Sequence, residues 1–248
     1  MPNDGPAAPA AHGPRHVPRE HHVTVERTAR YCTLGEPSDR LREVWFVCHG
    51  YGQLAHYFIR HFAPLDDGTR LIVAPEALSR FYLAGGTVAD HAASRVGASW
   101  MTREDREAEI NDYVDLLDAV HDRVFEQINR ATVTVTVLGF SQGTATVTRW
   151  VAHGRVRADH LIVWAGALPH DDSVTSPAVQ RIRLTSVVGT DDVFAADTTV
   201  VAERDRLAKL GLAPTEVRFD GGHRIDAPTL LAIASPPSID DREANDTA

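Results

Sequence analysis

The residues with the clearest potential for chemistry are Gly139, Ser141 and Gly143, at alternate positions of the segment VLGFSQG (137–143). An apolar run rich in β-branched residues precedes this segment, and a stretch with helical periodicity follows it. A serine between a strand and a helix sits in a sharp turn, and glycine two residues away on either side avoids a side-chain clash. The hydroxyl then lies at a helix N-terminus, where free N–H groups favour an oxyanion. The pattern predicts that Ser141 is a nucleophile.

A serine hydroxyl is a poor nucleophile without a base, so a histidine is needed beside Ser141. Two segments after Ser141 meet this need: the acidic turn GTDD (189–192), followed by the glycine-rich loop DGGH (220–223). Each comes after a strand-like run, at the carboxyl end where chemistry collects in open α/β sheets. Their order, acid before histidine, is the order that suits a nucleophile on such a turn. We predict His223 as the general base and one aspartate of the acidic turn as its partner.

Three other histidines follow Ser141, and each fits the role of base less well. His153 ends the helix that begins after Ser141, where a cation near the last carbonyls is the usual interpretation. His160 precedes a strand and so lies at the wrong end of the sheet. His170 comes before the acidic turn rather than after it.

An oxyanion on the substrate needs two converging backbone donors. The first is predicted to be the N–H of Gln142, directly after the nucleophile. The second is predicted to be the N–H of Tyr51, within the loop HGYG (49–52) that follows an early strand. We interpret His49 as a structural hydrogen-bonding residue rather than as a second base.

The elements that must position these residues alternate along the chain. Short apolar runs rich in β-branched residues are typical of buried strands in a mostly parallel sheet. They lie at 44–48, 71–74, 133–138, 161–164 and 184–188, with a further strand-like run at 216–219 and an edge hairpin or antiparallel strand expected within 23–34. Helical periodicity falls between them, at 110–128, 144–151 and 200–212. This alternation predicts a doubly wound α/β sheet with helices on both faces.

The long connection from Glu76 to Trp100 carries Phe81 and Tyr82, and long connections in compact domains are often functional. We expect it to form a wall of the cleft, with Phe81 and Tyr82 as substrate-binding residues; the alternative is a surface loop whose aromatic rings only pack on the core. No helical insertion lies between Trp164 and Leu184, so no separate cap domain is expected.

Composition limits the classes of partner. The chain has 248 residues, 43% of them hydrophobic, which suits one domain of residues 21–235 between a disordered tail at 1–20 and a flexible tail at 236–248. A formal net charge of -9 argues against a nucleic-acid partner. The sequence shows no signal peptide and no apolar run long enough to span a membrane, so a cytoplasmic location is expected.

Metal and disulfide chemistry are not expected either. The two cysteines, Cys32 and Cys48, lie in strand-like runs and suit small buried apolar groups. His16, His21 and His22 could be interpreted as a metal site, but a solvated tail is favoured because no carboxylate or cysteine completes a set with ligand spacing. We therefore expect no cofactor and no metal.

Taken together, these segments resemble the phospholipase/carboxylesterase group of α/β-hydrolases, which includes bacterial carboxylesterases and acyl-protein thioesterases. The resemblance covers roughly residues 44–233. It rests on VCHGYGQ (47–53), VAPEA (73–77), GASW (97–100), the helix from Glu107, LGFSQGT (138–144), VVGTDD (187–192) and GGH (221–223).

The resemblance implies an α/β-hydrolase fold and metal-free hydrolysis of a small-molecule carboxylic ester or thioester. It implies Ser141, Asp192 and His223 as the triad, with Asp191 as the alternative acid, and Trp100 on the acyl side of the cleft. The chain departs from the group's usual pattern at Tyr51-Gly52-Gln53, Thr144 and Val193-Phe194-Ala195. These departures remove no catalytic group, but they leave the acyl chain length, the leaving group and the oligomeric state open.

Overall fold

The computed structural model describes residues 18–83, 94–194 and 197–235. The described part contains a seven-stranded sheet in which all strands are parallel except the first, which is antiparallel and lies at one edge. In spatial order the strands are β1 (Tyr31–Leu34), β3 (Arg70–Pro75), β2 (Glu43–Cys48), β6 (Thr134–Phe140), β7 (His160–Trp164), β8 (Arg183–Gly189) and β9 (Thr215–Phe219). The mostly parallel α/β sheet predicted from the alternating pattern is confirmed.

The direction in which successive strands are added to the sheet reverses once, and this reversal marks a possible ligand site. The chain goes from β2 outward to β3 and then returns to β6 on the other side of β2. The carboxyl ends of β2 and β6 therefore diverge into different loops, and ligands bind at such a switch point in open α/β sheets. The loop that begins at His49 and the turn at Ser141 both start at this point.

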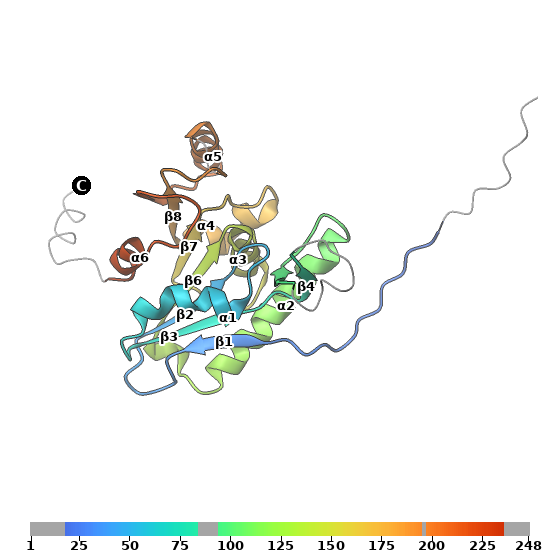
Figure 1. Cartoon of the computed structure of the whole chain (residues 1–248), viewed down its shortest axis with the longest axis horizontal. Coiled ribbons are helices and arrows are strands. Elements are labelled where there is room, and N and C mark those ends of the chain that lie inside the picture. The colour runs from blue at the N-terminus through green and yellow to red at the C-terminus, as the bar shows by residue number, and fades with distance from the viewer. Residues whose placement is uncertain (1–17, 84–93, 195–196, 236–248) are drawn as a thin grey trace, which may run out of the picture.

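Helices cover both faces of the sheet (Figure 1). In chain order the helical elements are α1 (Ala55–Phe58), which continues into the 3-10 helix η1 (Ile59–Leu65), α2 (Arg106–Phe125), η3 (Arg130–Thr132), α3 (Gln142–His153), η4 (Asp172–Thr175), α4 (Pro177–Arg181), α5 (Asp197–Lys209) and α6 (Ala227–Ala234). Between β7 and β8 the chain carries only η4 and α4, both short, so no cap domain is inserted there.

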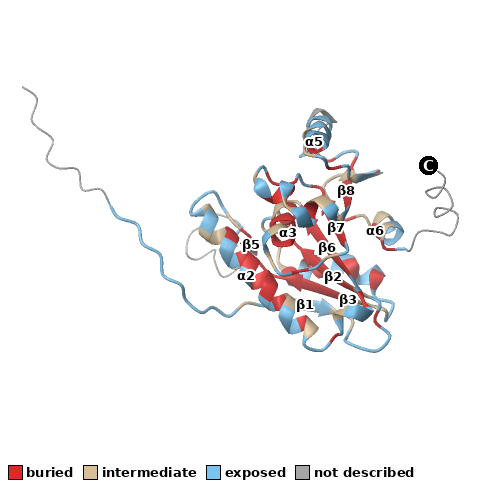
Figure 2. Ribbon diagram, turned by 180° about the vertical axis from the view of Figure 1, so that it is seen from behind, coloured by how far each residue is buried: buried red, intermediate tan, exposed pale blue. Residues whose placement is uncertain are grey.

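Strand alternation explains the two cores. In β2, Val44 and Phe46 face the layer that contains α2 and α3, whereas Trp45 and Val47 face the layer that contains η1 and α6. Successive side chains of a strand point to opposite faces, and a parallel sheet covered on both faces is apolar throughout. Figure 2 accordingly shows the central strands as buried along their length, while α5 is largely exposed.

Three expectations need correction or addition. The strand expected within 23–34 is limited to β1, and residues 18–30 form no helix or strand. The connection from Glu76 to Trp100 is not simply a loop, because it contains an antiparallel hairpin of β4 (Ser79–Tyr82) and β5 (Val96–Ser99). Helix α6 was not anticipated. Of the predicted tails, residues 1–17 and 236–248 lie outside the described residues, and residues 18–20 are exposed.

None of the helices in the described part of the chain combines the length and the apolar character needed to cross a membrane.

Candidate active site

Ser141 lies at the turn between β6 and α3, with the strained backbone that the motif predicts. Its φ and ψ angles are 53° and -116°, a region that non-glycine residues rarely occupy. Gly143 allows the turn to pack closely, because a Cβ at that position would lie 2.3 Å from the carbonyl oxygen of Cys48 on β2. The backbone N–H of Ser141 donates to Trp164 O on β7 at 2.9 Å, which fixes the turn to the next strand.

His223 and Asp192 are hydrogen-bonded to each other. The Nδ1 atom of His223 lies 2.8 Å from Oδ2 of Asp192, whose residue is only 4% exposed. An ionised carboxylate only accepts, so Nδ1 carries the proton and Nε2 is left with its lone pair. Asp192 Oδ1 accepts the N–H of Phe194 at 2.9 Å, so both carboxylate oxygens are engaged. Asp191, by contrast, is exposed.

The acidic turn and the histidine loop are joined through their backbones. Thr190 N–H donates to Phe219 O at 2.9 Å, and Asp191 N–H donates to Gly221 O at 2.8 Å. A Cβ on Gly189 would lie 2.2 Å from Gly221 O, so the close approach requires glycine at the end of β8. These contacts hold the carboxylate and the imidazole in one frame.

Two aromatic rings flank the imidazole of His223. Its centroid is 4.8 Å from the ring of Phe140, the residue that precedes Ser141, and 4.9 Å from the ring of Phe194. The contact with Phe140 brings the predicted base to the edge of the sheet where the predicted nucleophile lies. The contact with Phe194, which is 75% exposed, covers another side of the base.

The loop after β2 lies beside the nucleophile. A Cβ on Gly50 would be 3.2 Å from the Cβ of Ser141, so the backbone at Gly50 passes close to the hydroxyl. The Gly50 N–H is occupied by Oε1 of Gln53 at 2.8 Å. The Tyr51 N–H makes no hydrogen bond to another described residue, as suits a donor kept for a ligand.

His49 fixes the orientation of the Gly50–Tyr51 peptide. The Ala77 N–H donates to Nε2 of His49 at 3.1 Å, so Nε2 is the acceptor and Nδ1 carries the proton. Nδ1 then donates to Gly50 O at 2.8 Å. In a trans peptide the C=O and the following N–H point in opposite directions, so this bond also aims the Tyr51 N–H. Burial lowers the pKa of His49 to about 4, which keeps the ring neutral at pH 7. The structural role predicted for His49 agrees with this geometry.

The side chain of Gln142 makes a set of hydrogen bonds that the sequence does not predict. The side chain of Gln142 accepts the Trp100 N–H at 3.1 Å and donates to Ser99 Oγ at 3.1 Å and Met101 O at 2.8 Å. It therefore ties the residue after the nucleophile to the end of β5. The sequence predicts a role for the backbone N–H of Gln142 alone, because no spacing rule indicates which residues a glutamine side chain contacts.

Trp100 is more deeply placed than expected of a residue that lines a cleft. It is 3% exposed, and its indole N–H donates to His49 O at 2.8 Å. Its ring lies 5.0 Å from that of His49, between centroids. Trp100 thus supports the oxyanion loop, and it can offer a ligand only a small part of its surface.

Phe81 and Tyr82, predicted as substrate-binding residues, lie on strand β4 of the hairpin. The ring of Phe81 on β4 lies 5.0 Å from that of Tyr51, and Tyr51 is 60% exposed. Tyr82, the last residue of β4, is 50% exposed. The rings of Tyr51 and Phe81 form an aromatic bank beside the proposed oxyanion donor.

The other histidines are engaged elsewhere. His160 begins β7, at the end of the sheet opposite Ser141, and its Nε2 lies 2.8 Å from Thr185 Oγ1. His153 Nε2 lies 2.9 Å from Ser173 Oγ. Their placement agrees with the preference for His223.

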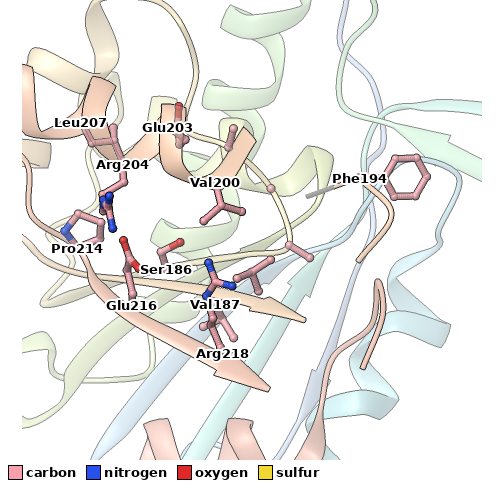
Figure 3. A pocket seen from close by; sticks show the side chains of 14 residues that line it. Ser186, Val187, Phe194, Val200, Glu203, Arg204, Leu207, Pro214, Glu216 and Arg218 are labelled. Atoms are coloured by element: carbon pink, nitrogen blue, oxygen red, sulfur yellow. The ribbon is translucent and has the colours of Figure 1, made fainter. Parts of the chain in front are cut away.

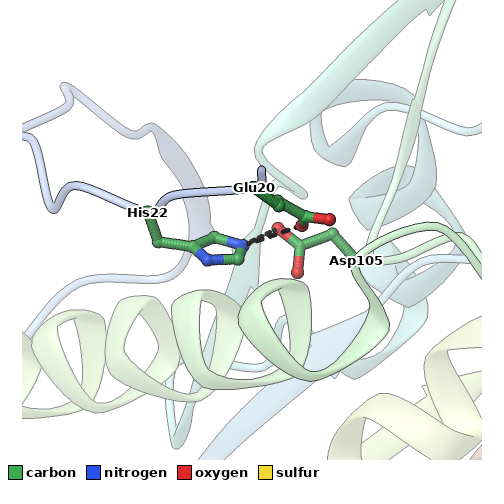
Figure 4. A group of neighbouring side chains, drawn as sticks. All are labelled: Glu20, His22 and Asp105. Carbon is green, nitrogen blue, oxygen red and sulfur yellow. Dashed lines mark hydrogen bonds and ion pairs between the residues drawn. The ribbon is translucent and has the colours of Figure 1, made fainter. Parts of the chain in front are cut away.

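A group of possible metal ligands, separate from the predicted triad, consists of Glu20, His22 and Asp105 (Figure 4). His22 Nε2 is 3.0 Å from Asp105 Oδ2 and 3.4 Å from Glu20 Oε1. All three residues are exposed, and the contacts are those of an ordinary surface ion pair. His16 lies outside the described residues. The expectation that the protein uses no metal stays a prediction.

Comparison with solved structures gives close matches in fold at low sequence identity. Esterase PE8 is 19% identical, with a TM-score of 0.60 over 84% of this chain and 96% of that one. Acyl-protein thioesterase 2 from Zea mays is 17% identical, with a TM-score of 0.57 over 83% and 96%. A phospholipase/carboxylesterase from Dyadobacter fermentans is 18% identical, with a TM-score of 0.56 over 83% and 94%.

The chain has the α/β-hydrolase fold. At these identities the likeness establishes architecture, and it confirms the fold that the sequence motifs implied. Searches against family models and against curated proteins gave no match.

Proposed function

We propose that the protein is a serine hydrolase that cleaves carboxylic esters through an acyl-enzyme on Ser141, with His223 as general base and Asp192 as its orienting acid. The observation that carries the proposal is the 2.8 Å bond from His223 Nδ1 to the buried carboxylate of Asp192, at the sheet edge where Ser141 occupies a strained turn. The esterase, thioesterase and phospholipase/carboxylesterase neighbours support the choice of reaction class.

The mechanism follows from the hydrogen-bonding capacity of each group. His223 Nε2 takes the Ser141 proton as the hydroxyl attacks the ester carbonyl, and Asp192 stabilises the imidazolium that forms. The oxyanion accepts from the N–H groups of Tyr51 and Gln142. His223 then protonates the leaving alcohol. Water repeats the sequence on the acyl-enzyme and releases the acid.

The first experiment is hydrolysis of p-nitrophenyl esters from acetate to palmitate, with Ser141→Ala measured in parallel. We expect activity with short acyl chains in the wild type, and a loss on the order of 10⁴-fold or more in Ser141→Ala. A fluorophosphonate probe should label the wild type and not the variant.

Two results would change the assignment. A maximum at long acyl chains, or faster turnover of the matching thioesters, would favour an acyl-protein thioesterase or lysophospholipase using the same residues. No hydrolysis at any length together with no labelling would mean that the triad is not assembled. A non-catalytic binding protein with a hydrolase fold would then be the better description.

A further inference from the structure

A pocket lies between α5 and the strands β8 and β9 (Figure 3). Its floor is the part of β8 and β9 that contains Ser186, Val188 and Glu216, and its roof is the face of α5 that carries Val200 and Leu207. The cavity volume is about 100 Å³. Figure 3 shows Phe194 at one end of the pocket and Pro214 toward the other.

The pocket exists because α5 packs incompletely on the strands beneath it. A helix that covers a sheet normally buries an apolar stripe against an apolar face. Among the α5 side chains that the structure describes, Leu207 is the one that is buried. On the strand face below, register pairs Ser186 with Glu216 and Val188 with Arg218, so much of that face is polar. Neither surface closes on the other as a core would.

The pocket adjoins the groups proposed to do the chemistry. Phe194 both lines the pocket and packs against the imidazole of His223, with ring centroids 4.9 Å apart. Gly166 lines it as well, and a Cβ there would lie 2.5 Å from Ser141 O. The pocket therefore lies behind Phe194, whose ring stands between it and the base, and behind the backbone of the nucleophile turn.

Its position relative to the base decides which part of a substrate it can receive. In ester cleavage the protonated base must deliver its proton to the leaving oxygen, so the alcohol portion lies beside the imidazole. The oxyanion points to the opposite loop, where Gly50 adjoins Ser141 and Tyr51 carries the free N–H. The aromatic bank of Tyr51 and Phe81 is on that oxyanion side.

We propose that the pocket beneath α5 is the leaving-group site and accepts a short alcohol of about four carbons, whose alkyl part contacts Val188, Val200 and Leu207 between the charged residues of the pocket wall, with the acyl chain directed toward the aromatic bank. This assignment rests on the proposed esterase activity. The size limit follows from the volume, because an apolar cavity of about 150 Å³ holds a benzene ring and this pocket is smaller.

The test varies the alcohol while the acid is held constant. Methyl, ethyl, propyl and butyl acetate release alcohols that leave with nearly equal ease, so differences in kcat/KM report binding of the alkyl group. We expect the wild-type kcat/KM to rise about fourfold for each added CH₂ up to butyl and then to level off. Val200→Phe places a ring in the pocket and should abolish this rise, so that the ratio of kcat/KM for butyl acetate to that for methyl acetate falls to about one.

The matched control is Val201→Phe, one residue along the same helix. Val201 is 43% exposed and does not line the pocket, so this variant should keep the wild-type alcohol profile. In a second series, methyl esters of increasing acyl length, Val200→Phe should show the same dependence on acyl length as the wild type. If Val200→Phe alters the acyl series instead, or alters neither series, the assignment of the pocket to the leaving group is wrong.

A measurement without turnover separates this proposal from the esterase proposal. Binding of 1-butanol to Ser141→Ala protein can be followed by saturation-transfer NMR, and the added change Val200→Phe should weaken it by about fourfold or more, the loss of at least one buried CH₂. Equal binding with and without Val200→Phe would overturn the pocket assignment. Absence of ester hydrolysis in the wild type would overturn only the proposed reaction.

Discussion

The two sides of Ser141 are built in different ways. On the oxyanion side, the His49 carbonyl accepts from the Trp100 indole, the Gly50 N–H donates to Gln53 Oε1, and the Gly50 carbonyl accepts from the His49 ring. On the α5 side, one helix lies over polar strand residues with a pocket between them. On the oxyanion side hydrogen bonds fix these backbone groups, whereas on the α5 side the space between the helix and the strands is only partly filled.

This difference separates two tasks of the proposed active site. Stabilising an oxyanion requires donors that do not reorganise during the reaction, and a fully bonded loop meets that need. Accommodating a substituent requires space, and close packing would remove it. The fold thus keeps its rigidity where charge develops and its free volume where the identity of the substrate is selected.

The largest expected effect tests the group that lies between the two sides. Asp192→Asn should lower kcat/KM by about 10⁴-fold, because an amide can donate to Nδ1 and stabilise the wrong tautomer of His223. Steady-state kinetics on p-nitrophenyl acetate measures this loss. The control is Asp191→Asn at the exposed neighbouring residue, which should leave kcat/KM nearly unchanged. A larger loss from Asp191→Asn would make Asp191 the acid.

A smaller effect is expected from loosening the bonded side. His49→Leu removes the donor to Gly50 O, so the Tyr51 N–H loses its fixed direction and kcat should fall by about 10²-fold with little change in KM. His49→Asn retains an N–H donor near the position of Nδ1 and should lose less. Circular dichroism would establish that both variants are folded. A folded His49→Leu enzyme with wild-type kcat would show that the loop needs no such support.

The smallest effect compares the packing of the two regions directly. Leu117 of α2 is 0% exposed within the core, and Leu207 of α5 is 2% exposed beside the pocket. Leu117→Ala should reduce the free energy of unfolding by about 3–5 kcal/mol. Leu207→Ala should cost about 2 kcal/mol, because its side chain already lacks contacts on the side of the pocket. Urea denaturation monitored by tryptophan fluorescence measures both, and equal losses would mean that α5 packs as tightly as α2.

The sequence was most informative where backbone geometry restricts residue type. The turn at Ser141 needs glycine on both sides, and the loops bearing Asp192 and His223 follow recognisable strands, so their placement at one sheet edge follows from topology. Period-two and apolar patterns were sufficient for the parallel strands. From the residues alone, however, Asp191 and Asp192 stayed equivalent, and only the fold shows that one is buried and the other exposed.

Features that depend on long-range contacts could not be predicted. The side chain of Gln142 is hydrogen-bonded to residues more than 40 positions away in the sequence, such as Trp100. Amide side chains carry no periodic signal that would predict such contacts. The β4–β5 hairpin lies around a segment whose polar and small residues indicate a loop. The pocket beneath α5 results from poor complementarity between two elements, each of which is ordinary by itself.

The backbone bonds between the turn at Thr190 and the loop at Gly221 also matter for protein engineering. They join the carboxyl ends of β8 and β9, whereas the excursion that follows Asp192 passes through α5 and enters β9 at its amino end. The acid and the base are thus tied to each other at the carboxyl ends of these strands, and Phe194, at the start of the excursion, contacts both. A library in which the excursion is exchanged or redesigned can therefore diversify substrate preference while the catalytic pair keeps its register.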